Sequence, residues 1–536
     1  MRFIPRIMMT QHPDSANKYV PIQEEPEEAI FALNPQPQGL GMEEVMVDYE
    51  GKLTPYHQLA QIALGLLKEN LKAGKEVFIT PRVASATAET VFRQLMALLS
   101  IMETNYLTYN DIGGFAIKEF IVPMCERPQD ILAVKKRVSN VIKLAHQEYL
   151  LTEDPDAIQV IPLIEDVPGL LEADRILGNY LKMCREEGFN IKYLRYMVGR
   201  SDPALAYGMV SSVLASKVAI SEMRKMGDDL NIKVYPILGA GSLPFRGHVT
   251  LENIENVLQE YAGIYTLTLQ SGMKYDHGYE NTRQLSSLLT HKIPYLPSLD
   301  YTSEEVKEMI NIIGVFFKHY LSTFIKIFPL INRISDLLPQ QRDRLQRISP
   351  VGYARDIARP EKILPFISDE SLKEEIKEIQ VKEKGDLPRA ITYTGALYSI
   401  GFPPEFMGTG RALEEIQERY GKELFNKLIN YYYPSLKGDL AAAYKYLNME
   451  NVRQFLPRET LGEIDKDREV CTGYFSLEET EMTEQDNLYH LLMETARPLL
   501  KQEIGLGDRL FEEEEAEKKL LQNLLVKMGR LRKSLG

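Results

Sequence analysis

Short apolar runs alternate with helical patterns through the first half of the chain, and this alternation restricts the possible folds more than any other feature. The runs are rich in β-branched and aromatic residues and nearly continuous in apolar side chains, which is typical of parallel strands buried on both faces. Five of them stand out: EVFITPR (76–82), AIQVIPLIE (157–165), IKYLRYMVG (191–199), IKVYPILGAG (232–241) and IYTLTLQSG (264–272).

The segments between these runs have apolar residues at helical spacing. VPGLLEADRILGNYLKMCREEG is expected to form a helix that stops at Gly188. SDPALAYGMVSSVLASKVAISEMRKMG is expected to form one helix from a cap at Ser201 to Gly227. From the third run onward, strand–helix units recur about every 35 residues, a normal length for parallel crossover units.

The second half of the chain changes character, because helical patterns dominate from about residue 301 and no low-complexity linker or sequence repeat separates the halves. We therefore predict an α/β fold: a parallel (β/α)8 TIM-type barrel with a large α-helical elaboration in the C-terminal half. The barrel strands are expected mainly within 40–300 and the elaboration within about 301–536, and the whole chain, 1–536, is expected to form a single domain.

The charge balance restricts the partners of the protein. The 536 residues carry a formal net charge of −13, which argues against a general nucleic-acid binder, since such a protein needs a basic face. Local arginines can still attract an anionic substrate. The cysteines are few, far apart and odd in number, as expected for the reducing cytoplasm: Cys125, Cys184 and Cys471.

Neither the N-terminus nor the most apolar later segment predicts a membrane protein. The first residues, MRFIPRIMMTQHPD, lack the long apolar core of a signal peptide. The run INIIGVFFKHYLSTFIKIF is interrupted by Lys318, His319 and Lys326, so we interpret it as a buried helix. A cytoplasmic location is expected.

Polar residues gather where the predicted strands end. Arg82 closes the first run, Glu165 closes the second, Asp202 follows the third, Arg246 lies in a glycine-rich turn after the fourth, and Gln270 ends the fifth. Each has a plain alternative, since a glutamate after a strand is often a helix cap and Asp202 could assist the cap at Ser201. Together they predict a site, because catalytic groups collect at the carboxyl ends of barrel strands.

The combination of carboxylates and arginines indicates a metal and an anion. Two carboxylates on adjacent strand ends can hold Mg²⁺ or Mn²⁺ and leave positions open for a phosphate ligand. Arginines supply planar, bidentate donors for phosphate or carboxylate. Further along, Arg355 and Arg389 lie beside glycine, tyrosine or proline in apolar surroundings, which favours a specific anionic partner, whereas Arg342 and Arg347 are interpreted as a charged helix face.

His12 lies in the turn-forming stretch MMTQHPDSANKY. From the residues alone two interpretations stay open: a loop near the chain terminus, or an imidazole delivered to an active site built by distant residues.

These motifs, in this order, resemble the phosphoenolpyruvate carboxylase family in its short archaeal-type form. The resemblance spans nearly the whole chain through TQHPDS, FITPRVAS, VIPLIED, GRSDPALAYG, GSLPFRG, TLQSG, GYARD and PRAITYTGALYSIGFPPEFMGTGRAL. It implies that bicarbonate attacks the phosphate of phosphoenolpyruvate, and that the resulting carboxyphosphate releases carbon dioxide for capture by the pyruvate enolate. The products are oxaloacetate and phosphate, and Mg²⁺ or Mn²⁺ is required.

The resemblance also implies roles for particular residues. Glu165 and Asp202 match the metal ligands. His12 matches the histidine that assists carboxyphosphate breakdown and protects the enolate. The matched arginines and glutamine line the site: Arg246 and Arg82 in catalysis, Arg355, Arg389 and Gln270 in substrate binding. A homotetramer is implied, and inhibition by a dicarboxylate such as aspartate or malate stays open.

The sequence departs from the long form of the family at the bicarbonate side of the site. The long form has a lysine where this chain has Leu205, and a histidine and an arginine where it has Leu238 and Ala240. Two other functions were weighed: another phosphoenolpyruvate- or pyruvate-dependent barrel enzyme, such as an aldolase or phosphotransferase, and a non-catalytic metabolite-binding protein. The first would not need His12 or the segment around Arg389, and the second would not need both metal carboxylates.

Overall fold

The structure is a computed structural model that describes residues 3–11, 14–151, 153–343, 357–381, 387–507 and 514–536. Eight parallel strands form a closed barrel in chain order, with β1 hydrogen-bonded to both β2 and β8. This confirms the predicted barrel. The strands are β1 Ile7–Thr10, β2 Glu44–Asp48, β3 Phe78–Arg82, β4 Glu119–Val122, β5 Gln159–Ile164, β6 Tyr193–Gly199, β7 Lys233–Gly239 and β8 Thr266–Gln270.

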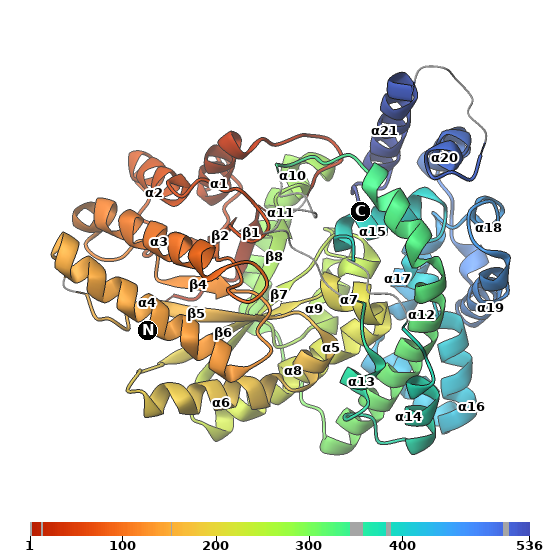
Figure 1. The fold of residues 1–536 in the computed structure, drawn as a ribbon, viewed down its shortest axis with the longest axis horizontal. Helices are drawn as coiled ribbons and strands as arrows, with labels where there is room; N and C mark the ends of the chain where they lie inside the picture. The colour runs from red at the N-terminus through yellow and green to blue at the C-terminus, as the bar shows by residue number, and fades with distance from the viewer. Residues whose placement is uncertain (1–2, 12–13, 152, 344–356, 382–386, 508–513) are drawn as a thin grey trace.

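The helices around the barrel occupy the red to yellow-green part of Figure 1. Long helices cover the sheet, and short helices or turns follow several strand ends. They are α1 Glu25–Leu33, α2 Gln58–Lys68, α3 Val91–Ile112, α4 Pro128–Tyr149, α5 Val167–Leu171, α6 Ala173–Glu186, α7 Ser201–Tyr207, α8 Met209–Asp229, α9 Ile254–Glu260, α10 Met273–Asp276 and α11 Tyr279–Lys292.

The second half forms the predicted helical elaboration, which packs against one side of the barrel through α12 on α8 and α15 on α7 (Figure 1). Its helices are α12 Ser303–Leu337, α13 Pro360–Ile363, α14 Glu370–Lys377, α15 Ala390–Ser399, α16 Thr409–Lys427, α17 Leu436–Tyr444, α18 Met449–Val452, α19 Arg458–Phe475, α20 Glu484–Glu503 and α21 Glu514–Leu531. The apolar run interpreted as a buried helix lies within α12, and none of the described helices combines the length and apolarity that a membrane span requires.

Three strands were missed by the sequence analysis, namely β1, β2 and β4. Each has only four or five residues, and the glutamates at the start of β2 and β4 interrupt the apolar pattern by which a buried strand is recognised. The structure explains these glutamates: Glu44 and Glu119 both bind Arg195 of β6, and all three side chains are buried. Arg195 and its two glutamates therefore form a buried ion-paired group that joins β2, β4 and β6. The composition of β2 or β4 alone does not predict this pairing.

The helix predicted from Ser201 to Gly227 is two helices. Gly208, with φ of 89°, separates α7 from α8, and a Cβ there would lie 3.0 Å from Cγ of Tyr320. Ser201 is the first residue of α7 rather than its cap, and its hydroxyl serves another partner, described below. Because α7 begins two residues after β6 ends, Asp202 in its first turn lies near the end of that strand.

Candidate active site

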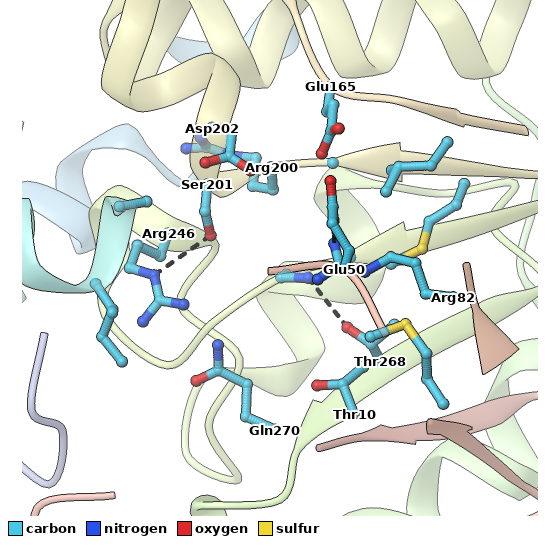
Figure 2. Close-up of a pocket in the computed structure, with 18 of the residues that line it drawn as sticks. Thr10, Glu50, Arg82, Glu165, Arg200, Ser201, Asp202, Arg246, Thr268 and Gln270 are labelled. Carbon is cyan, nitrogen blue, oxygen red and sulfur yellow. Dashed lines mark hydrogen bonds and ion pairs between the residues drawn. The ribbon is translucent and has the colours of Figure 1, made fainter. Parts of the chain in front are cut away.

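One cavity lies at the carboxyl ends of the barrel strands, and six of the residues predicted for the site line it. Figure 2 shows five of these six labelled around the same space. The six are Arg82, Glu165, Asp202, Arg246, Gln270 and Arg389. The two other predicted residues, His12 and Arg355, lie outside the residues that the structure describes.

Two carboxylates come from neighbouring strand ends. Glu165 directly follows β5 and is 6% exposed, and its Oε1 accepts a hydrogen bond of 3.1 Å from the Met124 backbone N–H. Asp202 stands in the first turn of α7, after β6. Gly199, at the end of β6, permits the close approach, since a Cβ there would lie 2.9 Å from Cβ of Glu165.

Arg246 ends the short 3-10 turn η2, Pro244–Arg246, which follows β7. Its side chain is held from two directions: Nε donates to the Ser201 hydroxyl across 3.3 Å, and Nη1 donates to the Gly536 main-chain oxygen. A Cβ at Gly241 would lie 3.1 Å from Cζ of Arg246 and 3.0 Å from Nε2 of Gln270. Glycine at 241 therefore lets both side chains approach the turn closely.

Arg82 is anchored by two carboxylates that the sequence analysis did not single out. Its Nε and Nη2 each donate to Asp48 across 2.9 Å, and its Nη1 lies 2.7 Å from Glu50. Burial disfavours the charged guanidinium, but Asp48 and Glu50 outweigh it and raise the pKa of Arg82 well above its ordinary value. Arg82 is thus a fixed, permanent cation at the cavity wall.

Arg389 reaches the same cavity from the helical elaboration. It immediately precedes α15, and its Nη2 donates to the Gly51 carbonyl across 3.2 Å. Gly51 follows β2 and also lines the cavity. A residue of the helical elaboration therefore lines the cavity together with residues of the barrel.

Some residues of the cavity lining were missed because the strands that carry them were not recognised. Thr10 ends β1 and Glu50 follows β2, so neither could be recognised as a strand-end residue. Thr268 could have been found, since it stands two residues before Gln270 and alternate residues of a strand share a face. Arg200 lies in the quoted GRSD segment, and its Nε donates to the Tyr261 hydroxyl across 2.9 Å.

The interpretation of Arg342 as part of a charged helix face is wrong. Arg342 is 1% exposed, and its guanidinium binds Glu25 at 3.2 Å, Glu28 at 2.9 Å and the Ser271 hydroxyl at 2.7 Å. Although burial raises the pKa of a carboxyl, Arg342 and Lys274 lower that of Glu28 to about 2. Spacing in the sequence could not show this, because the two glutamates lie more than 300 residues away in the chain.

The positions that depart from the long form carry no cation toward the site. Leu205 and Leu238 are buried in the hydrophobic core, and Ala240 lines the cavity. The Leu205 carbonyl accepts a hydrogen bond of 2.6 Å from the Tyr320 hydroxyl. Leu205 is therefore a packing residue, at the position where the resemblance places the lysine of the long form.

Comparisons with known proteins give the family. The model of the family described as phosphoenolpyruvate carboxylase matches residues 4–536. The phosphoenolpyruvate carboxylase of Methanosarcina barkeri is 42% identical and that of Methanopyrus kandleri 39%, each over 99% of this chain and 99% and 98% of the relative. That of Metallosphaera sedula is 32% identical over 91% of this chain and 90% of its own. The chain belongs to the phosphoenolpyruvate carboxylase family, in its archaeal-type form, and carboxylates phosphoenolpyruvate to oxaloacetate.

Proposed function

We propose that the cavity at the barrel mouth carries the reaction in two stages. An oxygen of bicarbonate attacks phosphorus, the bond from phosphorus to the enol oxygen breaks, and carboxyphosphate and the pyruvate enolate form. The C–O bond of carboxyphosphate then breaks to give carbon dioxide and phosphate, and the enolate carbon bonds to carbon dioxide. One observation carries this proposal: carboxylates, arginines and an amide from both halves of the chain line a single cavity.

Glu165 and Asp202 suit a divalent cation. Both are hard oxygen donors on the wall of one cavity, and they follow adjacent strands. Among the described residues no cluster of three or more histidine, cysteine or acidic side chains is arranged for a metal, so substrate and water would complete the coordination, as is usual for Mg²⁺. When bound, Mg²⁺ or Mn²⁺ supplies a Lewis acid for the negative charge that develops on the substrate oxygens.

Arg246 is the residue best placed to bind the phosphoryl group. Its planar guanidinium matches phosphate geometry, and the contacts to Ser201 and Gly536 fix the direction of that plane before substrate arrives. Arg82, already held by Asp48 and Glu50, and Arg389, which comes from the helical elaboration, add two further guanidinium groups to the cavity lining. Together with Arg246 they can stabilise phosphoenolpyruvate and bicarbonate, which are both anions.

Gln270 and His12 are assigned to the later stage. The Gln270 amide can donate to the enolate or carboxylate oxygens without adding charge. His12 is proposed to assist the breakdown of carboxyphosphate and to keep the enolate from premature protonation. Support comes from its position in the chain, because Thr10 lines the cavity and the Gln11 N–H bonds the Met46 carbonyl of the next strand.

The remaining assignments extend the proposal to the rest of the molecule. We propose that the chain acts as one domain, 1–536, with Mg²⁺ or Mn²⁺, in a cytoplasmic homotetramer that a dicarboxylate such as aspartate or malate can inhibit. Arg355 is proposed as a further substrate-binding arginine.

Parallel coupled assays test the proposed route. The purified protein is supplied with phosphoenolpyruvate, bicarbonate and Mg²⁺, and oxaloacetate is followed with malate dehydrogenase while pyruvate is followed with lactate dehydrogenase. We expect bicarbonate-dependent oxaloacetate, equimolar phosphate and transfer of ¹⁸O from labelled bicarbonate into phosphate. Label absent from phosphate would exclude attack by bicarbonate on phosphorus.

A further inference from the structure

The turn that presents Arg246 has an unusual backbone. Gly247 has φ of 129° and His248 has φ of 56°, so two consecutive residues after Arg246 are in the left-handed region. This backbone conformation is sterically unfavourable for His248, whereas glycine would adopt it freely. Such conformations persist only where the surroundings over-determine them, and they gather at functional sites. Something must therefore hold this turn.

Within the turn, backbone hydrogen bonds supply part of the support. The His248 N–H bonds the Leu243 carbonyl at 3.0 Å, and the Gly241 N–H bonds the Arg246 carbonyl at 2.8 Å. These contacts close the loop on itself but do not fix it against the rest of the protein.

Glu405 holds the residue before Arg246. It lies in η4, Pro404–Phe406, within the helical elaboration, and its side chain is completely buried. Its Oε1 accepts two hydrogen bonds of 2.8 Å, one from the Phe245 backbone N–H and one from the Tyr398 hydroxyl. Its Oε2 is buried without a hydrogen-bond partner in the described part of the chain. A buried carboxyl so incompletely satisfied is costly, which calls for a functional reason.

Asp439 holds the second residue after Arg246. It lies on α17, and one of its oxygens bonds Nδ1 of His248 while the other accepts a hydrogen bond of 2.6 Å from the Tyr433 hydroxyl. Glu405 and Asp439 thus reach the turn from two different elements of the helical half. Neither lines the cavity, so both act through the turn itself.

We propose that Glu405 and Asp439 are positioning residues for the carboxylation, two carboxylates that clamp Phe245 and His248 and so aim the Arg246 guanidinium into the cavity. This inference rests on the proposed role of Arg246. The inference also assigns a role to the motif FPPEFMGTG, which the proposed role of Arg389 does not explain. The glutamate of that motif holds the barrel turn that carries Arg246.

The first test compares three variants in the full-length enzyme. Glu405→Leu removes the acceptor for Phe245, and we expect kcat to fall about 10- to 100-fold with a change of less than about 3-fold in KM for phosphoenolpyruvate. Glu405→Gln keeps an acceptor oxygen and should restore at least about a third of wild-type kcat. Tyr398→Phe removes the other donor to the same oxygen and serves as the matched control, with near-normal kcat. Equal kcat losses in the leucine and phenylalanine variants would overturn the proposal.

His248→Gly tests the other arm even if Glu405→Leu does not fold. Glycine adopts the left-handed backbone freely, so this variant removes the Asp439 contact without adding strain. A purely structural histidine predicts that kcat is unchanged and that only the free energy of unfolding falls, because buried Asp439 loses a partner. Positioning predicts that kcat falls about 5- to 20-fold, whatever the change in stability. Wild-type kcat in this variant would remove Asp439 from the clamp.

An Arg246→Lys background separates this inference from the function on which it rests. If Arg246→Lys alone retains near-normal turnover, the proposed role of Arg246 is wrong. If Arg246→Lys is strongly impaired, adding Glu405→Leu should cost less than about 3-fold more, because the guanidinium that the clamp aims is already absent. Multiplicative losses in the double variant would mean that Glu405 acts elsewhere.

Discussion

Ser201 accepts a hydrogen bond from Nε of Arg246 across 3.3 Å, and Ser201 is the residue directly before Asp202 (Figure 2). This contact ties the proposed phosphate-binding arginine, after β7, to the proposed metal ligand, after β6. The Ser201 hydroxyl therefore links the two groups that we propose to act on the phosphoryl group, and it helps to orient the Arg246 guanidinium beside Asp202.

Removing this hydroxyl should slow the enzyme moderately. A hydrogen bond to a charged donor contributes about 1–2 kcal/mol, so Ser201→Ala should lower kcat/KM roughly 5- to 30-fold. Ser201→Thr keeps the hydroxyl and should lose less. Ser216→Ala, which removes a buried hydroxyl of α8 that is not part of the cavity lining, is the control and should leave kcat/KM unchanged. Equal rates in Ser201→Ala and wild type would show that Arg246 is oriented without Ser201.

Glu165 and Asp202, the two carboxylates proposed to bind the metal, should be indispensable. Glu165→Gln and Asp202→Asn keep the side-chain volume but remove charge, and we expect oxaloacetate formation to fall at least ~100-fold, the scale for a main electrostatic stabiliser. Mn²⁺ binding, followed by electron paramagnetic resonance, should weaken in parallel, while the circular dichroism spectrum stays unchanged.

Asp166 provides a matched control for these substitutions. It is the residue after Glu165, but its side chain caps α5 by accepting from the Gly169 N–H at 3.1 Å, and it does not line the catalytic cavity. Asparagine caps helices about as well as aspartate, so Asp166→Asn should bind Mn²⁺ and turn over normally. Loss of activity in Asp166→Asn equal to that in Glu165→Gln would remove the special role of Glu165.

Glu405 should give the protein a characteristic dependence of stability on pH. Burial raises its pKa from 4.5 to about 7, against hydrogen bonds from Tyr398 and Phe245 that lower it. Because the folded state holds this proton more tightly than the unfolded state, the contribution is fully present below pH 4.5 and is lost as pH rises through about 7. Glu405→Gln does not titrate, so it should gain stability relative to wild type over this range, by up to roughly 3 kcal/mol.

Urea unfolding of wild type and Glu405→Gln at about pH 5, 6, 7 and 8 measures this difference. The gap between the two unfolding midpoints should move steadily in favour of the glutamine variant up to about pH 7 and then stay constant. A gap that does not change with pH would mean that Glu405 is ionised in the folded protein at every pH tested.

The fold could be predicted from the sequence where a strand is long and apolar. β3 and β5 to β8 were recognised because most residues on both of their faces are buried, which leaves a nearly continuous apolar run. β2 and β4 were missed because each contains a glutamate that pairs with Arg195 on another strand. A local pattern cannot reveal a polar residue whose partner is brought near only by the closed barrel.

The site could be predicted to the same extent and for the same reason. Glu165, Asp202, Arg246 and Gln270 follow recognisable strands, so the rule that catalytic groups lie at strand ends places them together. Glu50 follows an unrecognised strand, and Glu405 and Asp439 act through a backbone turn that only the folded chain brings to them.

Arg342 shows what this limit means for stability. Because its buried guanidinium balances Glu25 and Glu28, Arg342→Met should leave buried carboxylates undercompensated and cost about 3–5 kcal/mol in the free energy of unfolding. Arg453, which pairs with Asp465 at the surface, is the comparison, and Arg453→Met should cost less than about 1 kcal/mol. Urea unfolding of both variants at neutral pH measures the difference. Equal small losses in the free energy of unfolding would show that the buried Arg342 contributes no more to stability than a surface charge does.

His12 should control what becomes of the enolate. His12→Asn leaves Glu165, Asp202 and Arg246 in place, so on the proposed route bicarbonate can still attack the phosphoryl group. The asparagine cannot accept a proton as a neutral imidazole can at about pH 8. We therefore expect the variant to form little oxaloacetate but to keep bicarbonate-dependent release of phosphate and pyruvate, because the enolate is protonated before it captures carbon dioxide.

The measurement follows pyruvate with lactate dehydrogenase and oxaloacetate with malate dehydrogenase in parallel, on the same His12→Asn preparation. His57→Asn is the control, since this histidine immediately precedes α2 and does not line the catalytic cavity, and it should leave the ratio of the two products unchanged. Loss of both products in His12→Asn would place the histidine at the attack on phosphorus instead. Oxaloacetate at the wild-type rate would show that His12 has no part in the reaction, because a group that guards the enolate cannot be removed without changing how the enolate is partitioned.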